Sequence, residues 1–244
     1  MLNIVIPMAG KGSRFADAGY VLPKPLIDVK GKPMIEVVVN NLRPECEHRF
    51  IFICLAEHID KYNLEKKLTD IASDCIIVPV NSVTEGAACT VLLSEKYINN
   101  EDPLMIANSD QYVDININEY LSSMENSDGL IMTMTANDTK WSFIKYNNLG
   151  YVTEVREKVV ISDEATVGIY NFAKGSDFVF GAHDMIEKNI RVNNEFYVAP
   201  VYNQLIELEK KIKYYNIGSE GCGMYGLGIP ADLEKFINCD IADR

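Results

Sequence analysis

The feature that most constrains this chain is a glycine-rich turn that directly follows an apolar run near the N-terminus. Residues 2–7 are apolar and largely β-branched, and the chain from Met8 to Arg14 then reads Met-Ala-Gly-Lys-Gly-Ser-Arg. Main-chain amides of such a turn can approach an anion closely, because glycine has no Cβ. Lys11 and Arg14 add positive charge, and Lys24 follows between two prolines that restrict its backbone. We therefore expect a strand that ends in a phosphate-binding loop.

After this turn, short apolar segments alternate with amphipathic ones. Continuous apolar runs predict strands at 50–55, 75–80 and 103–107. Helical spacing of apolar side chains predicts helices at 33–43, 57–72 and 85–95. Short apolar strands that alternate with helices indicate a parallel sheet with both faces covered.

The second half of the chain has a different order of elements, because predicted strands follow one another with short connectors. Strands are predicted at 129–135, 142–146, 151–156, 166–172 and 212–217. Helices are predicted at 176–190, 200–211 and 230–239. We expect one α/β domain, in which the second half extends the parallel sheet with antiparallel pairing.

The distribution of charge indicates the kind of ligand. The net charge is −12, but residues 1–32 carry five basic and only two acidic side chains, so the remainder of the chain has a net charge of −15. An acidic chain does not favour a nucleic-acid backbone as partner. A local basic segment within it favours a small anionic ligand.

Other composition features exclude several classes of protein. The apolar runs are of strand length and too short to span a membrane, and no basic-then-apolar leader opens the sequence. The six cysteines contain no C-x-x-C pair, which disfavours a disulfide framework or a zinc site. We expect a cytoplasmic protein without a membrane partner.

Three candidate features fall where strands are predicted to end, namely the 8–14 loop, the 81–86 segment and Asp110. Ligands of open α/β sheets bind at the carboxyl ends of the strands. The loop does not match the dinucleotide fingerprint, because Phe15 stands where that pattern requires glycine, and no Walker A sequence is present.

Three motifs together resemble the opening signature of the sugar-phosphate nucleotidylyltransferases. They are Met8-Ala9-Gly10-Lys11-Gly12-Ser13-Arg14, then Pro23-Lys24-Pro25-Leu26, then Gly31-Lys32-Pro33-Met34-Ile35. The resemblance implies a Rossmann-like, three-layer nucleotidyltransferase fold of the GT-A type, with a mostly parallel central sheet and an antiparallel extension. It implies a single domain over 1–244, in which residues 1–115 bind a nucleoside triphosphate (NTP) and residues 116–244 bind an acceptor. Members of this family join an NTP to a phosphorylated small molecule and release pyrophosphate.

The resemblance also implies roles for matching positions. The catalytic residues would be Arg14, Lys24 and Asp110, with Asp110 as the ligand of the cofactor Mg²⁺. The nucleotide-binding residues would be Met8, Ala9, Gly10, Lys11, Gly12, Ser13, Asn81, Thr84, Glu85, Gly86 and Ser109. The acceptor-binding residues would be Glu157, Lys158 and Thr166, and we add Glu195 and Tyr197 from the segment 193–203, which departs from the family pattern.

The chain departs from the family pattern in its second half. Gly226 stands where the family has a second metal-binding aspartate, and Val159 replaces the proline after the Glu-Lys pair. These departures, with the sequence of residues 193–203, resemble the capsule-biosynthesis branch, the CTP:phosphoglutamine cytidylyltransferases that serve phosphoramidate decoration. The implied substrates are CTP and L-glutamine phosphate, and a homo-oligomer is left open.

Alternative functions remain at this stage. One is a sugar-1-phosphate nucleotidylyltransferase that uses UTP, dTTP or CTP. A glycosyltransferase of related fold would need a D-x-D sequence, which Ser109-Asp110-Gln111 does not supply. The missing aspartate at Gly226 also allows a non-catalytic nucleotide-sensing module. Trp141 is open between a place in the sheet core and a place in the acceptor pocket, and Glu195 between a turn cap and a ligand contact.

Overall fold

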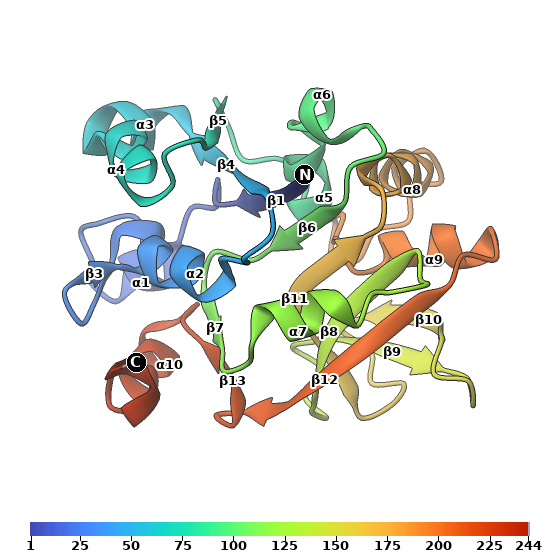
Figure 1. The fold of residues 1–244 in the computed structure, drawn as a ribbon. Helices are drawn as coiled ribbons and strands as arrows, with labels where there is room; N and C mark the ends of the chain where they lie inside the picture. The colour runs from blue at the N-terminus through green and yellow to red at the C-terminus, as the bar shows by residue number, and fades with distance from the viewer. Residues whose placement is uncertain (244) are drawn as a thin grey trace.

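One mixed sheet organises the molecule. The computed structural model describes residues 1–243, and within them eleven strands form this sheet (Figure 1). Nine of them follow one another in the order β5-β4-β1-β6-β11-β8-β12-β13-β7. The remaining two, β9 and β10, form a hairpin beside β11.

The first half of the chain supplies a parallel block, as predicted. Strands β4 and β6 both pair with β1 in parallel, and β5 pairs with β4 in parallel. The bounds of these strands are β1 Leu2–Pro7, β4 His48–Leu55, β5 Ile76–Val80 and β6 Leu104–Ala107. Ile4 and Ile6 face one core and Val5 faces the other, and all three are fully buried, so layers cover both sides of the sheet.

The second half supplies the predicted antiparallel extension. Strand β11 runs antiparallel to both β6 and β8, and β12 runs parallel to β8. The bounds are β7 Gln111–Val113, β8 Gly129–Thr135, β9 Ser142–Tyr146, β10 Val152–Glu157, β11 Glu164–Phe172, β12 Ile212–Glu220 and β13 Gly223–Gly226. A separate two-stranded sheet comprises β2 Asp28–Val29 and β3 Lys32–Pro33. The predicted fold class, a mostly parallel α/β sheet with an antiparallel part, is confirmed.

Helices cover both faces of the sheet, and each face has its own buried core. Buried side chains of α2, α4, α7 and α10 belong to one core, and those of α5, α8 and α9 belong to the other. The helices are α1 Ser13–Asp17, α2 Met34–Leu42, α3 Ala56–Tyr62, α4 Leu64–Ile71, α5 Ala87–Leu92, α6 Glu95–Ile98, α7 Ile117–Ser122, α8 Gly175–Glu187, α9 Val201–Glu207 and α10 Pro230–Ile237. Two short 3-10 turns are η1 Lys24–Leu26 and η2 Asp240–Asp243. None of the helices within residues 1–243 combines the length and apolar character that a membrane span requires.

Three predicted helices differ in extent. The predicted helix at 57–72 is two helices, because Asn63 adopts a left-handed conformation with φ of 49°, which asparagine tolerates better than most residues. The predicted helix at 85–95 begins only at Ala87, because Gly86 has a positive φ of 134°, which is far from helical backbone and favours glycine. The predicted helix at 200–211 ends at Glu207, since Glu209 also has a positive φ, of 59°.

The C-terminal part of the chain returns to the N-terminal half. Strand β13 pairs with β7, and α10 lies beside the segment that carries β3 and α2 (Figure 1). This return brings residues 226–232 close to the carboxyl end of β6. Lys24 and Asp110, two of the candidate catalytic residues, meet at this edge.

Candidate active site

The glycine-rich loop leaves the carboxyl end of β1 and packs against the segment that contains Lys24. Gly12 has a φ of 62°, and a Cβ added there would lie 3.3 Å from Cβ of Lys24. Helix α1 begins directly after Gly12 and carries Arg14, whose side chain is exposed. Lys24 itself opens the 3-10 turn η1 after Pro23. The two N-terminal motifs therefore form one surface rather than two separate loops.

Lys24 and Asp110 form an ion pair, although 86 positions separate them in the sequence. The distance between Nζ of Lys24 and Oδ2 of Asp110 is 2.7 Å, and each side chain is 23% exposed. Asp110 lies in the turn between β6 and β7, next to the buried Ser109. The structure thus places two of the three predicted catalytic side chains in contact at the edge where β1 and β6 end.

The segment around Gly226, where the resemblance implies a second metal-binding aspartate, also lies at Asp110. The amide of Leu227 donates to the backbone oxygen of Asp110 at 2.8 Å. A Cβ on Gly228 would lie only 2.7 Å from Oδ2 of Asp110, so glycine here leaves room for the carboxylate. The carboxylate of Asp232 lies against Gly226, with Oδ2 at 3.4 Å from the place a Cβ would occupy.

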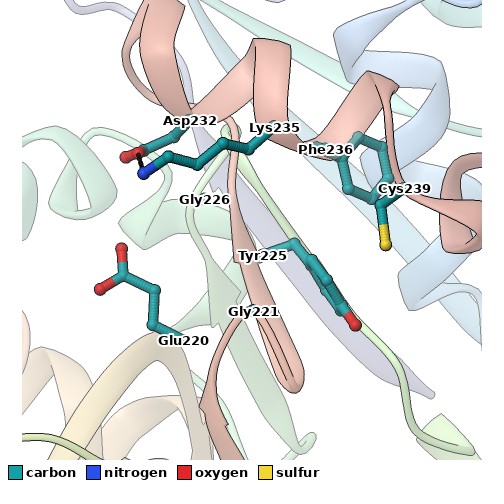
Figure 2. A pocket seen from close by; sticks show the side chains of 8 residues that line it. All are labelled: Glu220, Gly221, Tyr225, Gly226, Asp232, Lys235, Phe236 and Cys239. Carbon is teal, nitrogen blue, oxygen red and sulfur yellow. Dashed lines mark hydrogen bonds and ion pairs between the residues drawn. The ribbon is translucent and has the colours of Figure 1, made fainter.

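A cavity of about 460 Å³ opens on the other side of this segment. Figure 2 shows Glu220 pointing toward Asp232 and Lys235. Tyr225, Phe236 and Cys239, which also line the cavity, lie together on the other side of the strand that carries Gly226. Asp232 and Lys235 form an ion pair at 3.5 Å. The predicted catalytic residues Arg14, Lys24 and Asp110 are not among the residues that line this cavity.

Asp110 fits a magnesium ion on the chemistry of its donor atoms. Residues 1–243 contain no group of three or more His, Cys, Asp or Glu side chains that could hold a metal by themselves. Magnesium is commonly bound by one or two carboxylates, with substrate phosphates and water as the remaining ligands. A carboxylate beside the glycine-rich loop meets that requirement, and Asp110, whose Oδ2 is paired with Lys24 in this structure, is the residue that would hold the ion.

The second predicted nucleotide loop lies between β5 and α5. The hydroxyl of Thr84 donates to the backbone oxygen of Gly86 at 2.9 Å and shares a hydrogen bond of 2.6 Å with the hydroxyl of Thr90. Asn81 and Glu85 are exposed. The loop is therefore fixed at its helix end and open to ligand at its start.

Three predicted acceptor residues share one cavity of about 200 Å³, namely Glu157, Thr166 and Tyr197. The remaining polar side chains of its lining are Asn108, Lys140, Trp141, Ser142 and Tyr170. Of these, sequence reasoning weighed only Trp141, which the structure places half-buried at the cavity. Ser142 could not be found from the sequence, because only the pairing of β9 with β10 sets it opposite Glu157.

Glu157 is a buried carboxylate in this cavity. It is 6% exposed and accepts a hydrogen bond from the hydroxyl of Ser142. Burial raises the pKa of Glu157, the Ser142 hydrogen bond and the charge of Lys158 oppose the rise, and the charge of Glu195 adds to it. Glu195 itself is exposed and is not among the residues that line the cavity.

Lys158 is not among the residues that line this cavity, but it contacts Tyr197, which does line it. Nζ of Lys158 donates to the hydroxyl of Tyr197 at 2.7 Å and lies 4.9 Å from its ring centroid. This hydrogen bond is the main cause of a raised pKa of Lys158. The cavity thus contains a buried carboxylate, and an ammonium group is bonded to one of its lining side chains.

The raised pKa of Glu157 has a consequence for stability. The folded chain binds this proton more tightly than the unfolded chain, so the free energy of unfolding falls as pH rises from 4.5 through the raised pKa. Glutamine cannot ionise, so Glu157→Gln should not lose free energy of unfolding in this way. We expect the difference in free energy of unfolding between Glu157→Gln and the wild type to grow in favour of the variant across that pH window, and then to stay constant. Urea unfolding from about pH 4 to about pH 8 measures it.

Glu154→Gln is the matched control, since Glu154 lies on the same strand and its side chain is 34% exposed. An equal pH dependence for both variants would contradict a special environment at Glu157.

Comparison with known proteins identifies the class. The family model described as nucleotidyl transferase matches residues 4–199, so the chain belongs to the nucleotidyl transferase family. The nucleoside-diphosphate-sugar pyrophosphorylase of Vibrio cholerae RC9 has a similar structure, with a TM-score of 0.86 and 26% identity, over 97% of this chain and 100% of that chain.

Two curated relatives differ in the substrates that their names state. The mannose-1-phosphate guanyltransferase of Hypocrea jecorina is 26% identical over 190 residues, which cover 69% of this chain and 48% of that protein. The 2-aminoethylphosphonate cytidylyltransferase of Lancefieldella rimae is 52% identical over 40 residues, or 16% of each chain. The chain spans about half the length of the longer curated relatives it matches, at 48%.

Proposed function

We propose that this protein is a Mg²⁺-dependent nucleotidylyltransferase that joins an NTP to a phosphorylated small molecule and releases pyrophosphate. The observation that carries the proposal is the contact between Lys24 and Asp110 beside the glycine-rich loop. A cation, a carboxylate and the glycine-rich loop meet there at strand ends, which is the usual position of a ligand in an open α/β sheet.

The chemistry needs no nucleophilic side chain. A phosphate oxygen of the acceptor attacks the α-phosphorus of the NTP in line, and the bond from the α-phosphorus to the bridging oxygen of the β-phosphate breaks. Pyrophosphate leaves with that electron pair. Positioning and charge stabilisation account for most of the catalysis in such transfers.

The roles of the chain's own residues follow from this scheme. Amides of residues 9–13 and the forked guanidinium of Arg14 would hold the phosphates. The ammonium of Lys24 would stabilise charge that develops on the departing pyrophosphate. Asp110 would hold Mg²⁺, which would supply positive charge against the phosphates. We place the reaction in the cytoplasm, where nucleoside triphosphates are made.

Within this class we propose CTP and L-glutamine phosphate as the substrates. The local similarity to a cytidylyltransferase supports the base, although it covers only 40 residues. The volume of about 200 Å³ of the cavity that contains Glu157 supports a small acceptor. The buried carboxylate of Glu157 can accept a hydrogen bond from a nitrogen of L-glutamine phosphate. The alternative is a sugar-1-phosphate acceptor with UTP, dTTP or CTP, since hydroxyl groups can also donate to Glu157. A third candidate, a nucleotide-sensing module, rests on Gly226 and would bind nucleotide without turnover.

A pyrophosphate-release screen distinguishes these substrates. CTP, UTP, dTTP, GTP and ATP would each be combined with phosphoglutamine, phosphocholine and several hexose-1-phosphates in the presence of Mg²⁺. We expect release with CTP and phosphoglutamine, and none when the acceptor is omitted. Release with a hexose-1-phosphate alone would replace the proposed acceptor, and binding of nucleotide without release from any pair would favour the sensing module.

A further inference from the structure

The second nucleotide loop and the acceptor segment are joined through their backbones. The amide of Phe196 donates to the backbone oxygen of Glu85 at 2.8 Å, and the amide of Ala88 donates to the backbone oxygen of Phe196 at 3.0 Å. Gly86 lies between these two bonds with φ of 134°, and a Cβ there would lie 2.4 Å from the oxygen and 2.5 Å from the nitrogen of Phe196. Only glycine permits so close an approach of the two chains.

A tight turn holds Phe196 in this position. Val192 and Glu195 exchange two backbone hydrogen bonds, of 3.1 and 2.9 Å, around Asn193 and Asn194. Both asparagines have positive φ, of 50° and 62°, which is the backbone of a type I′ hairpin turn. The turn brings its two flanking residues, Arg191 and Phe196, into contact.

The exposed side chain of Arg191 contacts both of these segments. Its Nη1 lies 3.2 Å from Oε2 of Glu85, and its guanidinium lies 4.5 Å from the ring centroid of the buried Phe196. Its Nε donates to Oδ1 of Asn189 at 2.7 Å, which orients the group. One side chain therefore contacts both the nucleotide loop and the acceptor segment.

Both joined segments then enter the same cavity. Ala87 follows Gly86, Tyr197 follows Phe196, and both line the acceptor cavity. Tyr197 also accepts the hydrogen bond from Lys158. The two segments therefore share backbone hydrogen bonds and contribute neighbouring parts of the lining of one cavity.

We infer that residues 85–88 and 191–197 form one unit, the junction, which couples NTP binding to acceptor binding, and that Arg191 is its positioning residue. The inference rests on the proposed function, because it assumes that the 81–86 loop contacts the nucleotide. Nucleotide that orders the loop orders the acceptor wall through the junction, so the second ligand meets a site that is already formed. The coupling is reciprocal, so acceptor must strengthen NTP binding by the same factor.

Hydrogen–deuterium exchange of the whole chain tests the inference. We expect Mg²⁺ with CTP to slow exchange in peptides over 81–88 and also over 194–198. In Arg191→Met, which keeps an apolar stem but loses the ion pair and the stacked charge, exchange without ligand should rise about fivefold in both segments. Arg43→Met is the matched control, because Arg43 stacks on Phe50 at 5.4 Å and donates to a backbone oxygen at 2.7 Å, away from the junction.

Calorimetry of nucleotide with and without phosphoglutamine measures the coupling itself. The nucleotide used is a CTP analogue with a methylene group between the α- and β-phosphorus, so that no transfer takes place. We expect about tenfold tighter binding of this analogue with acceptor in the wild type and in Arg43→Met, and less than about threefold in Arg191→Met. The analogue alone should bind Arg191→Met up to about fivefold more weakly, in line with its looser loop, whereas a variant that had only lost stability would keep the tenfold effect of the acceptor.

The outcomes separate the inference from the function on which it rests. Protection of 81–88 without 194–198, or faster exchange in Arg191→Met confined to 189–193, would overturn the coupling and leave the proposed function standing. If none of CTP, UTP, dTTP, GTP or ATP protected any segment, the proposed function and the coupling would both be wrong.

Discussion

Replacement of Asp110 by asparagine is expected to lower kcat/KM for pyrophosphate release by about 10³-fold, because metal-ion stabilisation of the charge on transferring phosphates is worth several kcal/mol. The amide keeps the shape of the side chain but loses the charge that holds Lys24 at 2.7 Å and that would hold Mg²⁺. Steady-state kinetics at several Mg²⁺ concentrations measure the loss. We expect nucleotide binding to lose its Mg²⁺ dependence in the same variant, which calorimetry detects without turnover.

The matched control is Asp70→Asn. Asp70 forms an exposed ion pair of 2.6 Å with Lys66 on α4, far along the chain from the candidate site. Unchanged kinetics in this variant would show that loss of a carboxylate from an ion pair is harmless elsewhere. Full turnover by Asp110→Asn would show that the carboxylate is not a metal ligand.

Replacement of Lys24 by methionine is expected to lower kcat by about 10²-fold to 10³-fold, with a smaller change in KM. The ammonium would act on charge that is greater in the transition state than in the bound substrate, and such losses appear mainly in kcat. Lys24→Arg should restore little, because a planar fork does not replace a compact charge packed against Gly12 and Asp110. Initial-rate kinetics with saturating acceptor separate kcat from KM.

Lys66→Met removes the other lysine of the control pair and should leave both constants unchanged. A Lys24→Met variant in which KM alone rises would assign Lys24 to substrate binding and contradict its role at the leaving group.

The sequence predicts the N-terminal part of the candidate site well, because local chemistry fixes it. An apolar strand followed by small residues specifies the loop, and the parallel arrangement of β1 and β6 brings their carboxyl ends to one edge of the sheet. That rule alone places Asp110 near the loop. The contact with Lys24 needed the fold itself, since it depends on how η1 turns back after Pro23.

The acceptor cavity was predicted less completely, because it depends on pairing between strands that are distant in the chain. Glu157 and Tyr197 stood out by resemblance, whereas Ser142 becomes a partner of Glu157 only through the register of β9 and β10. The break at Asn63 was missed because the apolar spacing on both sides of it is helical, while the backbone there is left-handed. The short strands β7 and β13 lie at the end of the sheet and carry too few residues for a periodic signal.

The central claim is nucleotidylyl transfer, and the fate of the individual phosphates tests it most directly. CTP radiolabelled at the α-phosphate or at the γ-phosphate would be incubated with Mg²⁺ and phosphoglutamine, and the products separated by chromatography. We predict that the α-label enters a new compound that also contains the acceptor, and that the γ-label appears only in pyrophosphate. Transfer of the γ-label to the acceptor, or release of label without acceptor, would contradict the account.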